Sequence, residues 1–226
     1  LPDVGRRVEA LVEAMRAAGK SPATINRTLQ PLRKALTLAV EWDLLARVPK
    51  LPRFREPSGR IRVYTPEEEA AILAWLDVQD PAVGRLVRVL FATGFRLAEV
   101  LRRDKLVVGP GSVTVWDTKT GGGRTVPISP ATRALVEQLP ELDKDAVEWR
   151  WRKMREALGL GPDAVIHAIR HTCITRLIRG GMSVPKVMLW AGHRDVHTTM
   201  RYTHMAVEDL AEGVALVAPG VPSAAP

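Results

Sequence analysis

A run of prolines and charged residues divides this 226-residue chain into two parts of unequal size. Residues 47–62 read RVPKLPRFREPSGRIR and contain three prolines and one glycine among six basic residues and one acidic residue. Proline fixes φ and removes a backbone donor, so neither a helix nor a central strand can run through this stretch. We therefore expect domains over 1–46 and 64–218, a linker over 47–63 and a disordered tail over 219–226.

The first part of the chain has a helical pattern. Four apolar residues recur there at helical spacing: Val8, Leu11, Val12 and Met15. Gly19 is placed to end this helix. Ser21 and Pro22 then supply an N-cap and a proline at the first position of a second helix. Pro31 is expected to break or kink that second helix.

The second part opens on a helix signal. Residues 65–68 read TPEE, a capping box with proline at the first helical position. Apolar periodicity predicts helices over 70–76 and 83–91, and helical patterns return from Ala131 onward.

A short hairpin is predicted between these helical stretches. Residues 112–116 and 124–128 are rich in β-branched side chains, and Gly121 to Gly123 provide a turn between them. The predicted fold class is therefore mainly α with a small antiparallel β-sheet.

Positive charge is concentrated in the first quarter of the chain. Residues 1–63 hold 13 Lys and Arg against 6 Asp and Glu, whereas residues 64–226 hold 20 against 19. A local positive field favours a polyanion such as nucleic acid, because binding releases condensed counterions. An alternative interpretation is that these arginines only keep a solvated connector soluble. The candidate phosphate contacts are the cations of the linker: Arg47, Lys50, Arg53, Arg55, Arg60 and Arg62.

Composition excludes several other classes of protein. The single cysteine, Cys173, excludes an intramolecular disulfide framework and is compatible with a reducing cytoplasm. No apolar run reaches membrane-spanning length and no signal peptide opens the sequence, so no membrane partner is expected. Because the sequence begins with Leu1 rather than methionine, we expect a fragment of a longer protein.

Five short motifs in the second part carry residues suited to phosphoryl chemistry. They are TGFRLAE around Arg96, TKTG around Lys119, HAIRH over 167–171, GH at 192–193 and TTMRYTH around Tyr202. Each alone is ambiguous. An arginine three residues before a glutamate is usually a surface helix pair, and His167 with His171 has the spacing of a metal-binding pair.

Together and in this order, the motifs resemble the tyrosine recombinase (phage integrase) family. The resemblance covers the whole second part and is densest over 192–204, GHRDVHTTMRYTH. It implies a catalytic domain that cuts and rejoins DNA through a 3′-phosphotyrosyl intermediate, with no metal, cofactor or ATP. Residues 21–27 resemble the family's helical core-binding domain, which looks truncated here. Ala191 and Gly122 depart from the family's usual Leu and Lys.

The resemblance also assigns a role to each residue type. Two guanidiniums stabilise a pentacoordinate phosphorane and imidazoles bond its oxygens, while a lysine protonates the leaving 5′-oxygen and a tyrosine attacks. The implied catalytic set is Arg96, Lys119, His167, Arg170, His193 and Tyr202. Glu99 is expected to orient Arg96, His204 either to assist Tyr202 or to lie on a helix surface, and His171 to be a structural core residue.

The implied partners are double-stranded DNA and further copies of the chain, which form a homotetramer on paired sites and are monomers off DNA. The implied location is the cytoplasm of a prokaryote, on its nucleoid, with a chromosomal or phage-encoded gene. Three alternatives stay open: a type IB topoisomerase, a metal-dependent hydrolase using His167, His171 and His193, and a DNA-binding relative without catalysis. The hydrolase lacks acidic ligands at convincing positions. The small size of the chain and its GH…TT…Y-x-H motif favour the recombinase over the topoisomerase.

Overall fold

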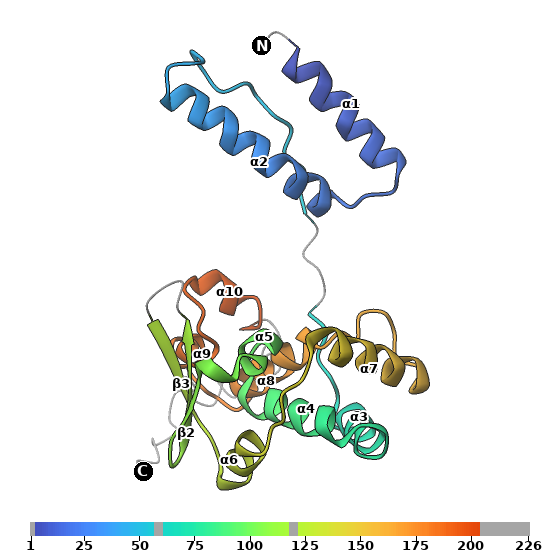
Figure 1. Cartoon of the computed structure of the whole chain (residues 1–226). Coiled ribbons are helices and arrows are strands. Elements are labelled where there is room, and N and C mark those ends of the chain that lie inside the picture. Colours follow the sequence, from blue (N-terminus) through green and yellow to red (C-terminus); the bar gives the residue numbers. More distant parts are fainter. Residues whose placement is uncertain (1–2, 57–60, 118–121, 204–226) are drawn as a thin grey trace, which may run out of the picture. The chain divides into compact units, whose positions relative to one another are not determined.

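The chain divides within the proline-rich segment, between Arg60 and Ile61, into two units with separate apolar cores. The computed structural model describes residues 3–56, 61–117 and 122–203. Over these ranges the predicted fold class is confirmed, since the elements are mainly helices with one three-stranded antiparallel sheet (Figure 1).

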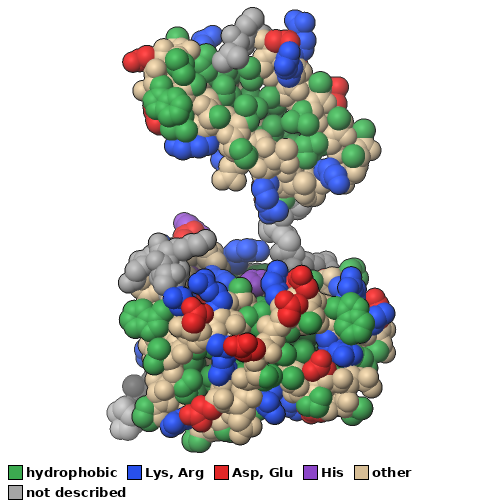
Figure 2. All heavy atoms as spheres, viewed as in Figure 1, with side chains coloured by type: hydrophobic (Ala, Val, Ile, Leu, Met, Phe, Trp, Pro, Cys, Tyr) green, Lys and Arg blue, Asp and Glu red, His purple; other side chains and the backbone are tan. Residues whose placement is uncertain are grey.

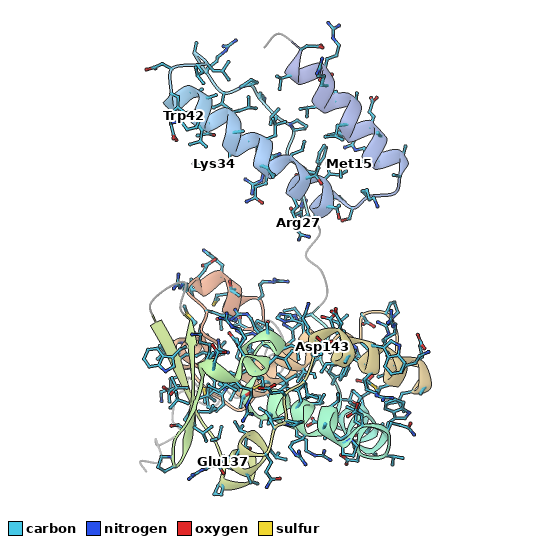
Figure 3. The ribbon with its side chains drawn as sticks, in the orientation of Figure 1. Met15, Arg27, Lys34, Trp42, Glu137 and Asp143 are labelled. Carbon is cyan, nitrogen blue, oxygen red and sulfur yellow. The ribbon has the colours of Figure 1, made fainter. Side chains whose placement is uncertain are left out.

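The first unit is built on α1 (Val4–Ala17) and α2 (Pro22–Glu41), which lie side by side (Figure 1). Gly19 has a φ of +69° after α1, and the Ser21 hydroxyl caps α2 by accepting from the backbone N–H of Thr24 at 3.3 Å. Met15 packs against the small core between the helices (Figure 3). The buried members of this core are Val8, Val12, Ile25 and Leu29.

The predicted break at Pro31 is wrong, because α2 continues through this residue to Glu41. Leu29 is fully buried before Pro31, and Leu36 is 5% exposed after it. Apolar burial on both sides of the proline outweighs the one backbone hydrogen bond that its ring removes.

Most of the proline-rich segment belongs to the first unit. The amide of Asn26, 8% exposed on α2, donates to the backbone carbonyl of Phe54 at 2.7 Å and to Glu56 Oε1 at 2.8 Å. Its oxygen accepts from the backbone N–H of Phe54 at 2.9 Å. Phe54 also packs on the apolar core, beneath the guanidinium of Arg16 at 4.6 Å. The linker expected over 47–63 is thus anchored to α2 over residues 54–56.

The second unit is organised around a central helix, α4 (Pro81–Thr93), which contacts α3 (Pro66–Gln79), α6 (Pro130–Glu137) and α8 (His167–Arg179). The predicted capping box at Thr65 is present at the start of α3. Most of the side chains of α4 are buried, which explains why this stretch reads as an apolar run in the sequence.

The remaining helices of the second unit are shorter or lie around this core: α5 (Leu97–Leu101), the 3₁₀ turn Arg103–Lys105, α7 (Lys144–Ala157), α9 (Val184–Ala191) and α10 (Val196–Met200). Helix α10 packs on α9, which in turn contacts α8 and β3 (Figure 1). A second apolar cluster forms there from Ile174, Val187, Ala191 and Tyr202.

The sheet has the order β1-β2-β3, with β1 (Leu106–Val108), β2 (Ser112–Asp117) and β3 (Gly122–Pro127) all antiparallel. The sequence did not predict β1, which is only three residues long. The glycine turn is partly wrong, because Gly122 and Gly123 pair within β3. A Cβ on Gly123 would lie 3.1 Å from the Trp116 ring, so this strand position favours glycine.

Acidic and basic side chains are interspersed on the visible face of the second unit (Figure 2). This agrees with the near balance of charge in that part of the sequence. Across the residues described, no helix combines the length and the apolar character needed to cross a bilayer.

Candidate active site

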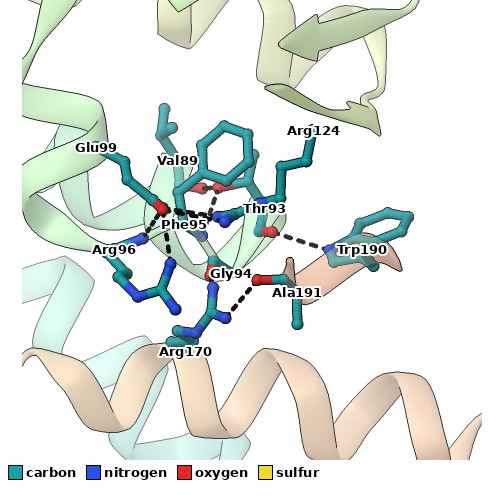
Figure 4. A network of polar contacts seen from close by, with 10 residues as sticks. All are labelled: Val89, Thr93, Gly94, Phe95, Arg96, Glu99, Arg124, Arg170, Trp190 and Ala191. Atoms are coloured by element: carbon teal, nitrogen blue, oxygen red, sulfur yellow. Dashed lines mark hydrogen bonds and ion pairs between the residues drawn. The ribbon is translucent and has the colours of Figure 1, made fainter. Parts of the chain in front are cut away.

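Arg170 is the most deeply buried cation of the site, with a relative exposure of 3% on α8. Its Nη1 donates to the backbone carbonyl of Gly94 at 2.7 Å, and its Nη2 donates to that of Ala191 (Figure 4). Burial lowers the pKa of Arg170 to about 10, with the charge of Arg96 acting in the same direction, so the guanidinium stays protonated at pH 7. Arg170 therefore fastens the ends of α4 and α9 to α8.

Arg96 lies at the N-cap of α5 and is held by Glu99 of the same helix (Figure 4). The carboxylate accepts from the Arg96 backbone N–H at 2.6 Å and from its Nη1 at 2.8 Å. The Arg96 side chain remains 46% exposed. Burial opposes ionisation of Glu99, but hydrogen bonds and charges from Arg124 and Arg96 hold its pKa below the usual range. This is the geometry that an orienting role for Glu99 requires.

His193 follows Gly192, which ends α9 with a φ of +66°. The His193 Nδ1 shares a hydrogen bond of 2.7 Å with the hydroxyl of Thr199, a fully buried residue of α10. Burial, together with the charges of Arg170 and Arg96, lowers the pKa of His193 to about 4. The ring is therefore neutral at pH 7 and fixed in orientation by Thr199.

Tyr202 is buried, with 4% of its surface exposed, in the apolar cluster of α8 and α9. Its hydroxyl shares a hydrogen bond of 2.5 Å with Nδ1 of His171. Burial raises the pKa of Tyr202 and lowers that of His171 to about 4. The structural role expected for His171 is therefore incomplete, because this half-buried residue touches the only tyrosine of the motif region.

His167 begins α8 and stands edge-on to His171, with ring centroids 4.8 Å apart. Burial lowers its pKa, as do the charges of Arg170 and Arg96. His167 and Arg96 together line a hollow of about 730 Å³ between α5 and α7. Arg96 also borders a second hollow of about 260 Å³ that includes His193. Arg96 thus stands between two recesses, each with a histidine in its wall.

The structure brings five of the six expected catalytic residues into one unit. Lys119 lies outside the described residues, as do His204 and Arg60. Among the expected phosphate contacts, Arg62 is 24% exposed and pairs with Glu68 and, at 3.5 Å, with Asp163. Four others are exposed on the first unit: Arg47, Lys50, Arg53 and Arg55.

Sequence reasoning gave no role to two contributors to the site, Arg124 and Thr199, and only a structural role to a third, His171. Arg124 lies three residues after the TKTG motif and Thr199 lies within the TTMRYTH motif, so these motifs could have singled them out. Within the described ranges, no group of three or more His, Cys, Asp or Glu side chains is placed to hold a metal ion. The Nδ1 atoms of His171 and His193 are both engaged within the protein.

The lowered histidine pKa values predict acid sensitivity. His171 and His193 titrate near 4 in the fold against an ordinary value of 6.5, so the unfolded chain binds more protons between these values. The free energy of unfolding should fall as pH drops from about 6.5 to about 4. The groups facing His171 are His167, Arg170, Arg201, His193 and Tyr202.

Urea unfolding at several pH values tests this. His171→Gln should reduce the slope of the free energy of unfolding against pH by at most about 1.4 kcal/mol per pH unit. The same substitution at the exposed His197 is the control. Equal slopes in the unsubstituted chain and in both variants would contradict the expectation.

The chain is similar in sequence to phage integrases and tyrosine recombinases. The sequence model of the Phage integrase family matches residues 140–209. The integrase of Escherichia phage P2 is 30% identical over 208 residues, covering 89% of this chain and 61% of that protein. Tyrosine recombinase XerC of Rhodospirillum centenum is 32% identical over 235 aligned positions, covering 89% of this chain and 67% of that protein. The chain spans about three fifths of the integrases of phages P2 and 186.

Solved structures share the fold. The XerH site-specific recombinase, in a post-cleavage complex with a palindromic difH substrate, matches with a TM-score of 0.72 at 16% identity, over 96% of this chain and 73% of that one. The catalytic domain of bacteriophage HP1 integrase matches with a TM-score of 0.55 at 25% identity, over 72% of this chain and all of that one. Given this fold, and the 32% identity to XerC over two thirds of its length, the chain belongs to the tyrosine recombinase family of the phage integrases.

Proposed function

We propose that this chain is a site-specific DNA recombinase that cleaves and rejoins strands through a 3′-phosphotyrosyl bond to Tyr202. Its biological use would be the integration or excision of a mobile element. The observation that carries the proposal is the gathering of Arg96, Arg170 and neutral histidines in the unit that buries Tyr202. The integrase and XerC relatives support it.

Two guanidiniums supply the positive charge that the reaction needs. A phosphodiester under attack gains negative charge on its non-bridging oxygens, and fork-shaped donors stabilise that charge. Arg96 is half-exposed and can turn its remaining N–H groups toward a phosphate. Arg170 uses two of its five N–H groups on carbonyls and keeps three. We therefore propose a reaction that needs neither metal nor ATP, since the phosphotyrosyl ester conserves bond energy.

Two proton transfers accompany the exchange of bonds. As the Tyr202 oxygen bonds to phosphorus, its proton passes to a neutral imidazole, with His167 the candidate acceptor by family resemblance. As the bond from phosphorus to the 5′-oxygen breaks, that oxygen takes a proton from Lys119. Religation runs both transfers in reverse, so protons and charges balance over a full cycle.

The buried phenol sets a condition on this chemistry. With 4% of Tyr202 exposed and its hydroxyl on His171, a phosphodiester cannot reach the oxygen without displacing some of these contacts. We propose that DNA binding supplies the free energy for that movement.

The working form that we propose is a homotetramer on two DNA sites, assembled from chains that are monomeric off DNA, at the nucleoid of a prokaryotic cell. This follows from the family resemblance. The HP1 integrase catalytic domain and XerH share the fold that such an assembly would use.

Tyr202→Phe should abolish covalent protein–DNA adducts while leaving duplex affinity within about 3-fold, because the phenol oxygen bonds to phosphorus only during reaction. The substrate is a pool of nicked duplexes with randomised cores, in which cleavage releases a short strand and traps the adduct. Captured DNA is sequenced and the adduct peptide is mapped by mass spectrometry. Tyr64→Phe, which removes the chain's other tyrosine, is the control. An adduct on Tyr64 or on any serine would refute the assignment, and loss of adducts in excess EDTA would refute metal independence.

Lys119→Ala should slow cleavage by roughly 10²–10⁴-fold, the range typical of a lost general acid. In a duplex with sulfur at the bridging 5′ position, the 5′ end of the cleaved strand leaves as a stable thiolate and needs no proton. On that duplex Lys119→Ala should cleave nearly as fast as the unsubstituted chain, whereas Arg96→Ala should remain slow. If sulfur fails to restore the Lys119→Ala rate, the lysine has another role.

The exposed cations of residues 47–55 are proposed to contact DNA phosphates. Replacing Arg53 and Arg55 with alanine should weaken binding and lower the salt slope by about one for each lost phosphate contact. Arg133→Ala, which removes an exposed arginine on α6 paired to Glu137, is the matched control. Fluorescence anisotropy over a salt series measures the slope, and an unchanged value in the double variant would leave these arginines as solubilising charge.

A further inference from the structure

One carboxylate is shared by two arginines from distant parts of the second unit (Figure 4). Besides its bonds to Arg96, Glu99 accepts from Arg124 Nη2 at 2.7 Å and from Arg124 Nη1 at 3.0 Å. Both oxygens therefore serve both arginines. Arg124 approaches through two parallel donors, the geometry in which a guanidinium binds a carboxylate most strongly.

Arg124 is held in a closely fitted place on β3. Its side chain is 13% exposed, and its guanidinium lies 4.8 Å from the centre of the Phe95 ring. A Cβ on Gly192 would stand 2.8 Å from Arg124 Nη1 and 2.9 Å from its Cδ, so the absence of a side chain there makes room for the arginine. Arg124 thus lies against both the Arg96 turn and the turn that carries His193.

The sharing of Glu99 decides how much charge Arg96 can offer. A carboxylate paired with Arg96 alone would cancel its charge and hold its N–H groups. With Arg124 bound to the same two oxygens, the three groups keep a net charge of +1, and Arg96 remains half-exposed. The pair with Arg124 is also the more buried of the two, where attraction is screened less by water.

We infer that Arg124 is a positioning residue for the cleavage reaction. The positive charge of Arg124 offsets the negative charge of Glu99, so the positive charge of Arg96 stays available to the phosphate. Arg96 is still held in place, because its backbone N–H and one side-chain N–H bind Glu99. The inference rests on the proposed function, because it concerns the stabilisation of the same phosphorane. It adds a role for a residue that acts through its pair with Glu99.

The test compares Arg124→Met with Arg88→Met. Arg88 forms a similar two-pronged pair with Asp77, at 2.6 Å for Nη1, and joins α3 to α4 away from the site. Rates of adduct formation are measured with saturating protein, below the unfolding temperature of each variant, on a duplex captured from the randomised pool. Arg124→Met should slow adduct formation by about 10- to 100-fold, as expected when a catalytic group is misplaced. Arg88→Met should stay within about 3-fold of the unsubstituted chain.

A second substrate separates positioning from a general structural effect. A methylphosphonate at the scissile position replaces one charged oxygen with a methyl group, so the transition state needs less positive charge. The defect of Arg124→Met should shrink to about 3-fold on this duplex if charge stabilisation is what was lost. Adding Glu99→Gln to Arg124→Met should also restore part of the rate on ordinary DNA, since it frees Arg96 from an unshared carboxylate.

The outcomes are distinct. Equal defects on both duplexes, a rate like that of Arg88→Met, or no gain from Glu99→Gln would overturn the inference while leaving the recombinase proposal intact. If Arg124→Met does not fold, Arg124→Gln removes the same charge while keeping a polar side chain, and should show the same dependence on substrate. No adduct from the unsubstituted chain on any duplex would overturn the proposed function, and this inference with it.

Discussion

The second unit depends on one buried guanidinium, that of Arg170. It binds the carbonyls that end α4 and α9 and so joins the distant helix α4 to the consecutive helices α8 and α9. Helices α4 and α9 both end in glycines with positive φ, at Gly94 and Gly192, which turn the chain toward α8. The residues that follow these glycines include Arg96 and His193. Removing such a buried charge leaves two carbonyls without donors, so the geometry of the whole site follows from this contact.

The sequence predicted helix ends well where they depend on residues that are close in sequence. The capping box at Thr65, the N-cap at Ser21 and the end of α1 near Gly19 depend on neighbours within a few residues. The errors arose where distant packing decides. Helix α2 passes through Pro31 because apolar burial holds both of its halves. Gly123 lies in β3 opposite Trp116, where a Cβ would stand 3.1 Å from the indole ring.

The same distinction applies to the site. Family motifs identified the groups that would meet the phosphate, because these residue types are required by the chemistry. They gave no role to Arg124 and only a structural one to His171, whose partners stand 25 and 31 residues away in sequence. Contacts over such separations depend on how helices and strands pack, which periodicity cannot specify. Burial, together with the charges of Arg170 and Arg96, also keeps His167 and His193 neutral, which only the three-dimensional arrangement reveals.

The burial of Tyr202 has a consequence for how accurately a DNA site is selected for cleavage. The phenol lies in an apolar cluster and is hydrogen-bonded to His171, so its oxygen is not open to a phosphodiester in this arrangement. Under the proposed function, a duplex must bind strongly enough to draw the phenol out before a strand can be cut. Weak binding to the wrong sequence would then leave the chromosome intact, since discrimination is applied once at binding and again at exposure of the tyrosine. The packing of Val187 and Ala191 with Tyr202 would contribute to that threshold.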